Sequence, residues 1–154
     1  MRIPASVDYA IRAMAELASA GDGPVTAEEL ARAQGIPLKF LRGIMTELKR
    51  SRLVSSQRGP DGGFVLTRPA EEISLADIFR AIDGPLATVR DQSLSSMTHT
   101  GAAAELPTVW MAVRASLRRV LEGVTIADLA AGSLPAAITD LASEYRAETE
   151  SRRS

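Results

Sequence analysis

The sequence predicts a mainly α-helical protein with a single small β-hairpin, and three observations support this fold class. Apolar residues recur at helical spacing through most of the chain, as they do in amphipathic helices. One short stretch, residues 53–67, changes to strand-like segments on either side of a glycine-rich loop. A third stretch, residues 106–124, repeats apolar residues at alternating intervals of three and four, which is the pattern of helices that pair with other helices.

Length and composition fit one globular domain, with or without an extended arm. The chain has 154 residues, of which 45% are hydrophobic, so a core can form without a disulfide or metal. It has no cysteine, which excludes disulfides, thiol catalysis, zinc knuckles and thiolate-held iron–sulfur clusters. No apolar run approaches the ~18 residues of a membrane span, and the first residues lack the pattern of a secretory signal. We therefore expect a cytoplasmic protein with no membrane partner.

Three helices are expected within the first fifty residues. The first covers residues 6–20. Thr26 and Glu29 form a capping box at the start of the second helix, and Gly35 suits its C-terminal end. Pro37 suits the first turn of the third helix, which runs to about residue 50. The predicted core face of this third helix consists of Phe40, Leu41, Ile44, Met45 and Leu48.

A hairpin and a fourth helix follow. Residues 53–57 and 64–67 are the two strand candidates, and the loop Arg58-Gly59-Pro60-Asp61-Gly62-Gly63 joins them. Ser74 and Asp77 form a box-like pair at the start of a helix that ends near residue 84.

The second half of the chain begins with residues 86–105, which show little periodicity. A connection of this length in a compact domain is usually functional or disordered. The heptad seam comes next, and its members are Leu106, Trp110, Val113, Leu117, Val120 and Val124. Its breadth favours pairing with a second subunit, although packing on its own domain would produce the same pattern. Shorter helices are expected after Thr125 and from about Pro135 to Tyr145.

These elements divide the chain into four parts. Residues 1–84 form the first domain and residues 85–105 form a loop. Residues 106–147 form a dimerisation helix with C-terminal helices, and residues 148–154 form a polar tail that we expect to be mobile.

Charge is unevenly distributed along this nearly neutral chain. Residues 32–68 contain eight basic and two acidic residues, a net charge of +6, while the whole chain carries −1. A local basic face on a neutral protein is typical of a specific DNA-binding protein, although a solvated surface would look the same from charge alone.

Three helices followed by a hairpin are the element order of a winged helix-turn-helix, whose second motif helix enters the DNA major groove. Leu38, Lys39 and Arg42 would then lie on the first turns of this reading helix, away from its core face. Arg58 lies in the hairpin loop beside Gly59 and Pro60, where the glycine lets the backbone approach DNA and the arginine can enter a narrow minor groove. A plain hairpin turn with a solvated arginine is the alternative.

Several motifs also resemble those of the Rrf2 family of bacterial transcription regulators. They are Tyr9-Ala10-Ile11-Arg12-Ala13-Met14, Leu53-Val54-Ser55-Ser56, Arg58-Gly59-Pro60-Asp61-Gly62-Gly63-Phe64 and Ile82-Asp83-Gly84. The resemblance covers roughly residues 1–130. It implies a homodimer, a dimerisation helix from Pro107 to Glu122, palindromic operator DNA, and contacts from Arg58 and the first turn of the Pro37 helix. Ser56, beside the loop, is a candidate phosphate contact.

Sensing members of this family place three cysteines in the loop that here covers residues 86–105, and they hold an iron–sulfur cluster there. This chain has serine and threonine hydroxyls in that loop, which are poor ligands for cluster iron. We therefore expect no cofactor. His99 could ligate a metal with Asp91 or Glu105, but a lone loop histidine is more often simply exposed.

The predicted function is a sequence-specific DNA-binding transcriptional regulator, acting as a dimeric repressor on double-stranded DNA. The alternative is a protein-interaction module that uses the winged surface, which would not require the basic strip. An enzyme is not expected, because no nucleophile–base set or carboxylate pair stands out. A small-molecule or protein effector stays open.

Overall fold

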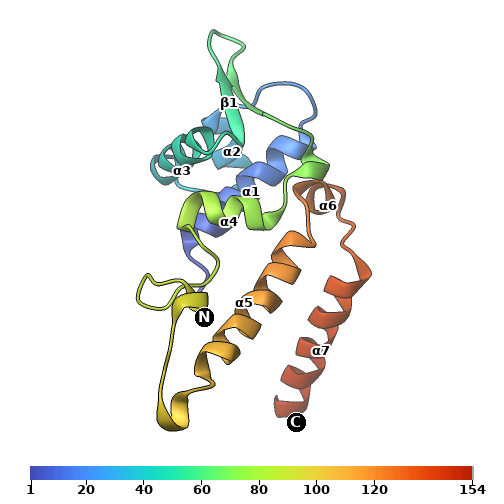
Figure 1. The fold of residues 1–154 in the computed structure, drawn as a ribbon. Helices are drawn as coiled ribbons and strands as arrows, with labels where there is room; N and C mark the ends of the chain where they lie inside the picture. The colour runs from blue at the N-terminus through green and yellow to red at the C-terminus, as the bar shows by residue number, and fades with distance from the viewer. Residues whose placement is uncertain (154) are drawn as a thin grey trace.

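The computed structural model describes residues 1–153 and is mainly helical with one two-stranded sheet. Figure 1 shows the order of the elements along the chain. They are α1 (Ala5–Ser19), α2 (Ala27–Gln34), α3 (Leu38–Arg50), β1 (Val54–Gln57), β2 (Gly63–Leu66), η1 (Ala70–Glu72), α4 (Leu75–Asp83), η2 (Leu94–Ser96), η3 (Gly101–Ala103), α5 (Leu106–Glu122), α6 (Ile126–Ala131) and α7 (Ala136–Arg153), where η marks a 3₁₀-helix. The predicted fold class is confirmed.

Three helices begin with a complete capping box. Thr26 and Glu29 cap α2 reciprocally, through backbone-to-side-chain hydrogen bonds of 3.1 and 2.8 Å. Ser74 with Asp77 does the same for α4, and Thr125 with Asp128 does so for α6. In each box two backbone donors that a helix start leaves free are satisfied, so the sequence itself fixes where these helices begin.

The core is built around α1, which contacts α2, α3, α4 and α6. Its fully buried side chains include Met14, Leu30, Leu41, Met45 and Leu48. Ile126 of α6 is also fully buried in this core. The chain therefore returns to the N-terminal half after α5, and backbone hydrogen bonds join Leu75 to Val124 and Ile126 to Ile73. The first domain is completed by a segment from beyond residue 106.

The connection between α4 and α5 is mostly irregular, as its weak periodicity predicts. It contains only the short turns η2 and η3 within the described chain. Two apolar side chains, Leu86 and Leu94, are buried and anchor it. Arg90 and Asp91 between them have positive φ angles of 51° and 58°, so the chain reverses sharply there.

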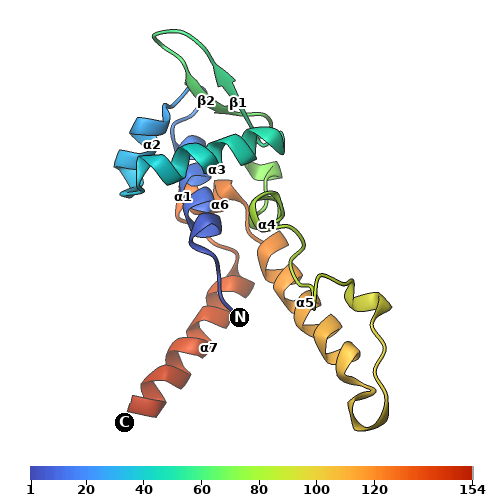
Figure 2. The ribbon, with the colours of Figure 1, turned by 90° about the vertical axis from the view of Figure 1, so that its left-hand side faces the viewer.

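The helices α5 and α7 extend from the core on the side opposite the hairpin and diverge from each other (Figures 1 and 2). Most of the predicted seam on α5 is exposed, including Trp110 at 37% and Val113 at 43%. Its last member, Val124, is buried. The seam therefore leaves an apolar face open along α5 rather than packing on its own domain.

The last helix is longer than the sequence predicts. The sequence predicts a helix that ends near Tyr145, but α7 continues to Arg153. Residues 146–153 contain no glycine or proline and are rich in arginine and glutamate, which have high helix propensity. No residue of α7 is buried, so local propensity rather than packing accounts for this extension.

Candidate nucleic-acid interface

The turn between α2 and α3 positions the exposed side of α3. Gly35 has left-handed angles (φ 61°, ψ 37°) that end α2, which confirms the predicted role of this residue. The amide of Ile36 then donates to the carbonyl of Ala31 at 2.9 Å, and the Ile36 side chain is buried. This anchored turn fixes the angle between the two helices, so that α3 lies across the core with one face in solvent.

The structure corrects which side chains of α3 face the core. Leu41, Ile44, Met45 and Leu48 are buried as predicted. Phe40, which was also predicted for the core face, is 64% exposed. Leu38, predicted to point away from the core, is half-buried and packs against it. Leu38 lies one turn before Leu41 and can join the buried stripe, while Phe40 lies at its edge, where no neighbouring element covers it.

Lys39 and Arg42 lie on the exposed side of α3, as expected. Arg42 is not free, because its Nη2 donates to Glu28 Oε1 of α2 at 2.7 Å. This hydrogen bond from Arg42 holds the pKa of the Glu28 carboxyl below its usual value. Lys39 has no carboxylate partner among residues 1–153.

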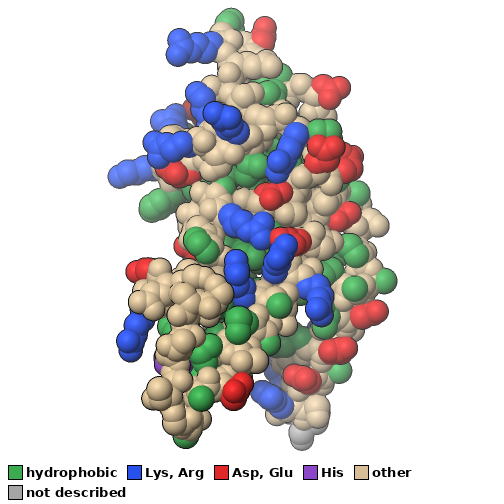
Figure 3. Space-filling model, viewed as in Figure 1, with side chains coloured by type: hydrophobic (Ala, Val, Ile, Leu, Met, Phe, Trp, Pro, Cys, Tyr) green, Lys and Arg blue, Asp and Glu red, His purple; other side chains and the backbone are tan. Residues whose placement is uncertain are grey.

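Three of the eight basic residues in the positive segment form ion pairs. These are Arg42 with Glu28, Arg50 with Glu47 at 2.6 Å, and Arg68 with Asp77 at 3.0 Å. The other five form no ion pair with the part of the chain that the structure describes: Arg32, Lys39, Lys49, Arg52 and Arg58. Figure 3 shows lysine and arginine side chains over the hairpin and the α3 side of the molecule, and others over its middle and lower part. The positive charge of this face therefore exceeds what its own carboxylates neutralise.

The hairpin projects beyond the helices and presents its loop to solvent (Figure 2). Strands β1 and β2 pair antiparallel from Val54 with Leu66 to Gln57 with Gly63. The loop closes with a hydrogen bond of 3.0 Å from the Gly62 amide to the Gly59 carbonyl. Arg58, Gly59 and Pro60 are all exposed. An exposed arginine beside a glycine of positive φ (108° at Gly59) can approach a surface closely.

The base of the hairpin is attached to the segment that precedes α2. Val25 and Phe64 exchange backbone hydrogen bonds of 3.0 and 2.8 Å. Gly63 has a φ of 149°, and a Cβ placed there would lie 2.6 Å from the carbonyl carbon of Val25. A residue with a side chain cannot occupy this position unless the hairpin moves, so Gly63 sets the angle at which the hairpin leaves the core.

We expect Gly63→Ala to destabilise the fold by about 1–3 kcal/mol or more, since it adds both backbone strain and a backbone clash. Urea unfolding would measure the change. Gly59→Ala is the matched control, because Gly59 also has positive φ but a Cβ there would meet no atom within 4 Å. Equal destabilisation by the two substitutions would show that the Val25 contact does not constrain the hairpin.

A groove of about 460 Å³ joins the hairpin to the helix-turn-helix. Arg42 and Glu28 line its helical side, and Ser56, Arg58 and the Gly59–Pro60 turn line its hairpin side. Five of the seven predicted site residues thus meet in one concave surface, namely Arg42, Ser56, Arg58, Gly59 and Pro60. Leu38 and Lys39 are outside this groove.

Comparison with known proteins identifies the family of this chain. Residues 3–132 match the profile of the Rrf2 family, described as iron-dependent transcriptional regulators. The chain belongs to the Rrf2 family. It is 50% identical over 153 residues to Rv1287 of Mycobacterium tuberculosis, which is named as an HTH-type transcriptional regulator, and the match covers 99% of this chain and 95% of that protein. It is 30% identical over 130 residues to IscR of Yersinia enterocolitica, covering 84% and 79%.

Solved structures of Rrf2 regulators share the fold. CymR of B. subtilis, the global cysteine regulator, superposes with a TM-score of 0.69 at 26% identity, covering 86% of this chain and 98% of that one. IscR of T. potens superposes with a TM-score of 0.66 at 31% identity, covering 84% and 85%. The protein is thus a DNA-binding transcriptional regulator with a winged helix-turn-helix, and its relatives are regulators rather than enzymes.

This Rrf2 chain does not offer the ligands that an iron centre of the thiolate type needs. It has no cysteine, and the segment between α4 and α5 supplies hydroxyl groups instead. Within residues 1–153 no group of three or more histidine and carboxylate side chains is arranged to hold a metal ion. The same residues include no helix that is both long and apolar enough to cross a membrane.

Sequence reasoning did not place Glu28 in the groove or Phe40 on the exposed side of α3. Glu28 precedes the positive segment, and nothing local in the sequence relates it to Arg42 fourteen residues later. Phe40 follows the apolar pattern of its helix, and only the positions of the neighbouring elements show that it is exposed.

Proposed function

We propose that the protein is a dimeric repressor that binds palindromic operator DNA through two copies of this surface. In each copy α3 enters the major groove and presents Leu38, Lys39 and Arg42 near the base edges and phosphates. The hairpin places Arg58 in the neighbouring minor groove, with Ser56, Gly59 and Pro60 along the backbone. The observation that carries the proposal is the groove that Arg58 of the hairpin and Arg42 of α3 both line.

Electrostatics supports DNA as the partner. Arg58 and Lys39 have no carboxylate partner within residues 1–153, so their charges are available to phosphates and to guanine edges. To contact DNA, Arg42 must break its ion pair with Glu28. A base or phosphate would then take the place of that carboxylate. Narrow minor grooves have an enhanced negative potential that attracts an inserted arginine.

The exposed seam of α5 supports the dimer. A contiguous row of apolar side chains on a projecting helix is unusual on a monomer, and a second copy of the same helix would cover it. A twofold dimer places two reading helices on the same face of the duplex, so the half-sites should be about one helical turn, or a multiple of it, apart. A dimer that occupies such a site blocks the DNA beneath it, which is the simplest form of repression.

The test is a selection of bound duplexes from random DNA, followed by titration of the selected duplex at two salt concentrations. Affinity should fall by about 1,000-fold or more between 50 and 200 mM salt if six or more phosphates are contacted, because counterions are released. The selected sequences should be inverted repeats. Selection of no sequence, or an affinity that does not change with salt, would favour the protein-interaction module instead.

A further inference from the structure

The side of α5 that faces away from the seam carries a second concave surface, separate from the hairpin groove. It is an open hollow of about 490 Å³ along the surface of this one helix. Its lining side chains are Met111, Arg114, Ala115, Arg118, Arg119 and Glu122. Three guanidinium groups and one carboxylate give this lining a positive charge, whereas the whole chain carries −1.

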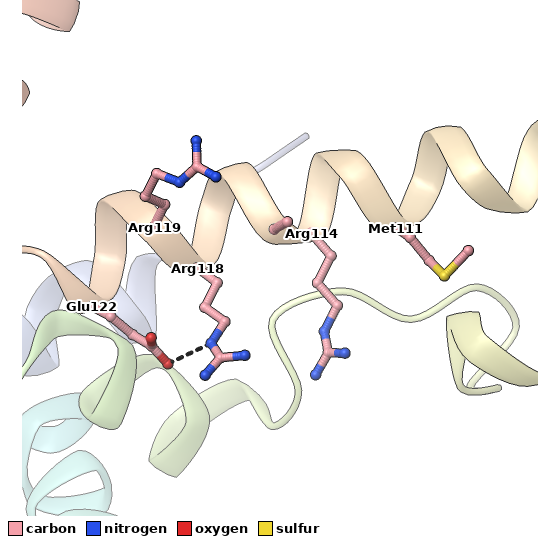
Figure 4. A pocket seen from close by; sticks show the side chains of 6 residues that line it. Met111, Arg114, Arg118, Arg119 and Glu122 are labelled. Atoms are coloured by element: carbon pink, nitrogen blue, oxygen red, sulfur yellow. Dashed lines mark hydrogen bonds and ion pairs between the residues drawn. The ribbon is translucent and has the colours of Figure 1, made fainter.

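Two of the arginines form a pair that can hold one ligand. Arg114 and Arg118 are one helical turn apart, which places their Cβ atoms about 5–6 Å from each other. Figure 4 shows both side chains, with Met111, extending from the same side of α5, while Arg119 extends from the opposite side. Arg114 forms no ion pair with any residue from 1 to 153. Arg118 pairs with Glu122, and Glu122 also pairs with Arg80.

Most of the lining lies beside the seam rather than on it. Met111, Ala115 and Arg118 follow one stripe along α5, and the seam residues Trp110 and Val113 follow another. Arg114 lies one turn after Trp110, at the edge of the seam. A helical turn of 3.6 residues separates these two stripes by more than a quarter of the circumference.

We propose that Arg114 and Arg118 form the binding site of a small organic dianion, such as a dicarboxylate or a phosphate ester. A guanidinium binds either group through two parallel hydrogen bonds, and the i,i+4 pair suits a ligand with two negative charges a short distance apart. Met111 and Ala115, which lie along the same stripe, provide an apolar surface for the carbon chain between those charges. A monoanion would engage only one of the two arginines.

Ion pairs connect this site to the winged domain. Glu122 Oε1 accepts hydrogen bonds from Arg118 Nε at 2.9 Å and from Arg80 Nη2 of α4 at 2.7 Å. Asp77 extends this chain of ion pairs toward the hairpin. Its carboxylate lies 4.0 Å from Arg80 and 3.0 Å from Arg68, which follows β2. A dianion competes with Glu122 for Arg118 and so changes the link between α5 and α4. This regulatory step rests on the proposed function, because its output is operator affinity.

Calorimetric titration of the full chain with succinate, butyrate and inorganic phosphate, at constant ionic strength, tests the site without DNA. Succinate or phosphate should bind one per subunit with a Kd in the millimolar range or tighter, and butyrate about 10-fold more weakly. Tighter binding of succinate identifies the dicarboxylate class, and tighter binding of phosphate identifies the phosphate class. Failure of both dianions to bind in the millimolar range overturns the proposal.

Variants separate a built site from general attraction to a positive surface. Arg114→Gln should weaken dianion binding about 10-fold or more, whereas Arg146→Gln on α7 should not change it. Glu122→Gln should strengthen binding several-fold, because it removes the competing carboxylate. Equal losses in the two arginine variants, or weaker binding in Glu122→Gln, would contradict the assignment.

The DNA measurement comes last and uses the selected operator. The dianion that binds should shift operator affinity in the native chain and leave it unchanged in Arg114→Gln. A bound dianion with no effect on operator affinity would overturn the regulatory step. If the chain selects no DNA at all, the proposed function fails while the calorimetry still decides the site.

Discussion

Arg58→Ala is expected to weaken operator binding by roughly 30-fold or more while leaving the melting temperature unchanged. An arginine that contacts bases or the minor groove contributes about 1–3 kcal/mol, and a dimer carries two such arginines. Arg58 is exposed and forms no ion pair with the described residues, so its removal takes no contact away from the fold. Fluorescence anisotropy on the selected operator, together with thermal unfolding, measures both quantities.

The control for this variant is Arg146→Ala, which removes the same charge from α7, on the side of the core away from the hairpin. Equal loss of affinity in the two variants would mean that net charge, rather than the position of Arg58, controls binding. Unchanged affinity in Arg58→Ala would remove the hairpin from the interface and leave α3 as the only candidate reading element.

The fold was predictable where the determining residues are close in sequence. In each capping box the two partners are three residues apart, so their hydrogen bonds hardly depend on the rest of the molecule. The hairpin is similar, because the glycines of its loop allow the positive φ angles that the turn needs and the strands are short. The end of the last helix was predicted too early, because the polar residues 146–153 were interpreted as a tail. These residues have a local preference for a helix, and α7 includes them.

The surface itself was less predictable, because it depends on distances between elements. Phe40 is exposed and Leu38 is half-buried, the reverse of the prediction, because of which neighbouring elements contact α3. The apolar pattern of α3 contains no information about those neighbours. The Glu28–Arg42 ion pair needs the α2–α3 turn to be formed first. Counting charges along the segment therefore overstates how many cations are free to bind DNA.

The seam of α5, unlike the DNA-binding surface, could be predicted from the sequence, since its spacing alone favours a helix that pairs with another helix. In the single chain the seam is still largely exposed, with Trp110 and Val113 among its open side chains. In the proposed dimer a second copy buries this face, and the two copies bring two reading helices onto one duplex. The seam and the hairpin therefore make separable contributions to operator affinity, one through the number of half-sites engaged and the other through contacts within each.

Val113→Asp should convert the dimer into a monomer and lower operator affinity by ~100-fold or more, because avidity from two linked half-sites adds factors of about 100 to 10,000. At a twofold seam one substitution brings two carboxylates close together in an apolar contact, where they repel each other and lose hydration. Light scattering after size exclusion would report the mass, and anisotropy the affinity. Ala112→Asp adds the same charge at an exposed position on another side of α5, and it should remain a dimer with native affinity. A Val113→Asp protein that stays dimeric on the operator would show that the subunits associate through another surface. A monomeric Val113→Asp protein that keeps full affinity would show that a single winged domain is sufficient for binding.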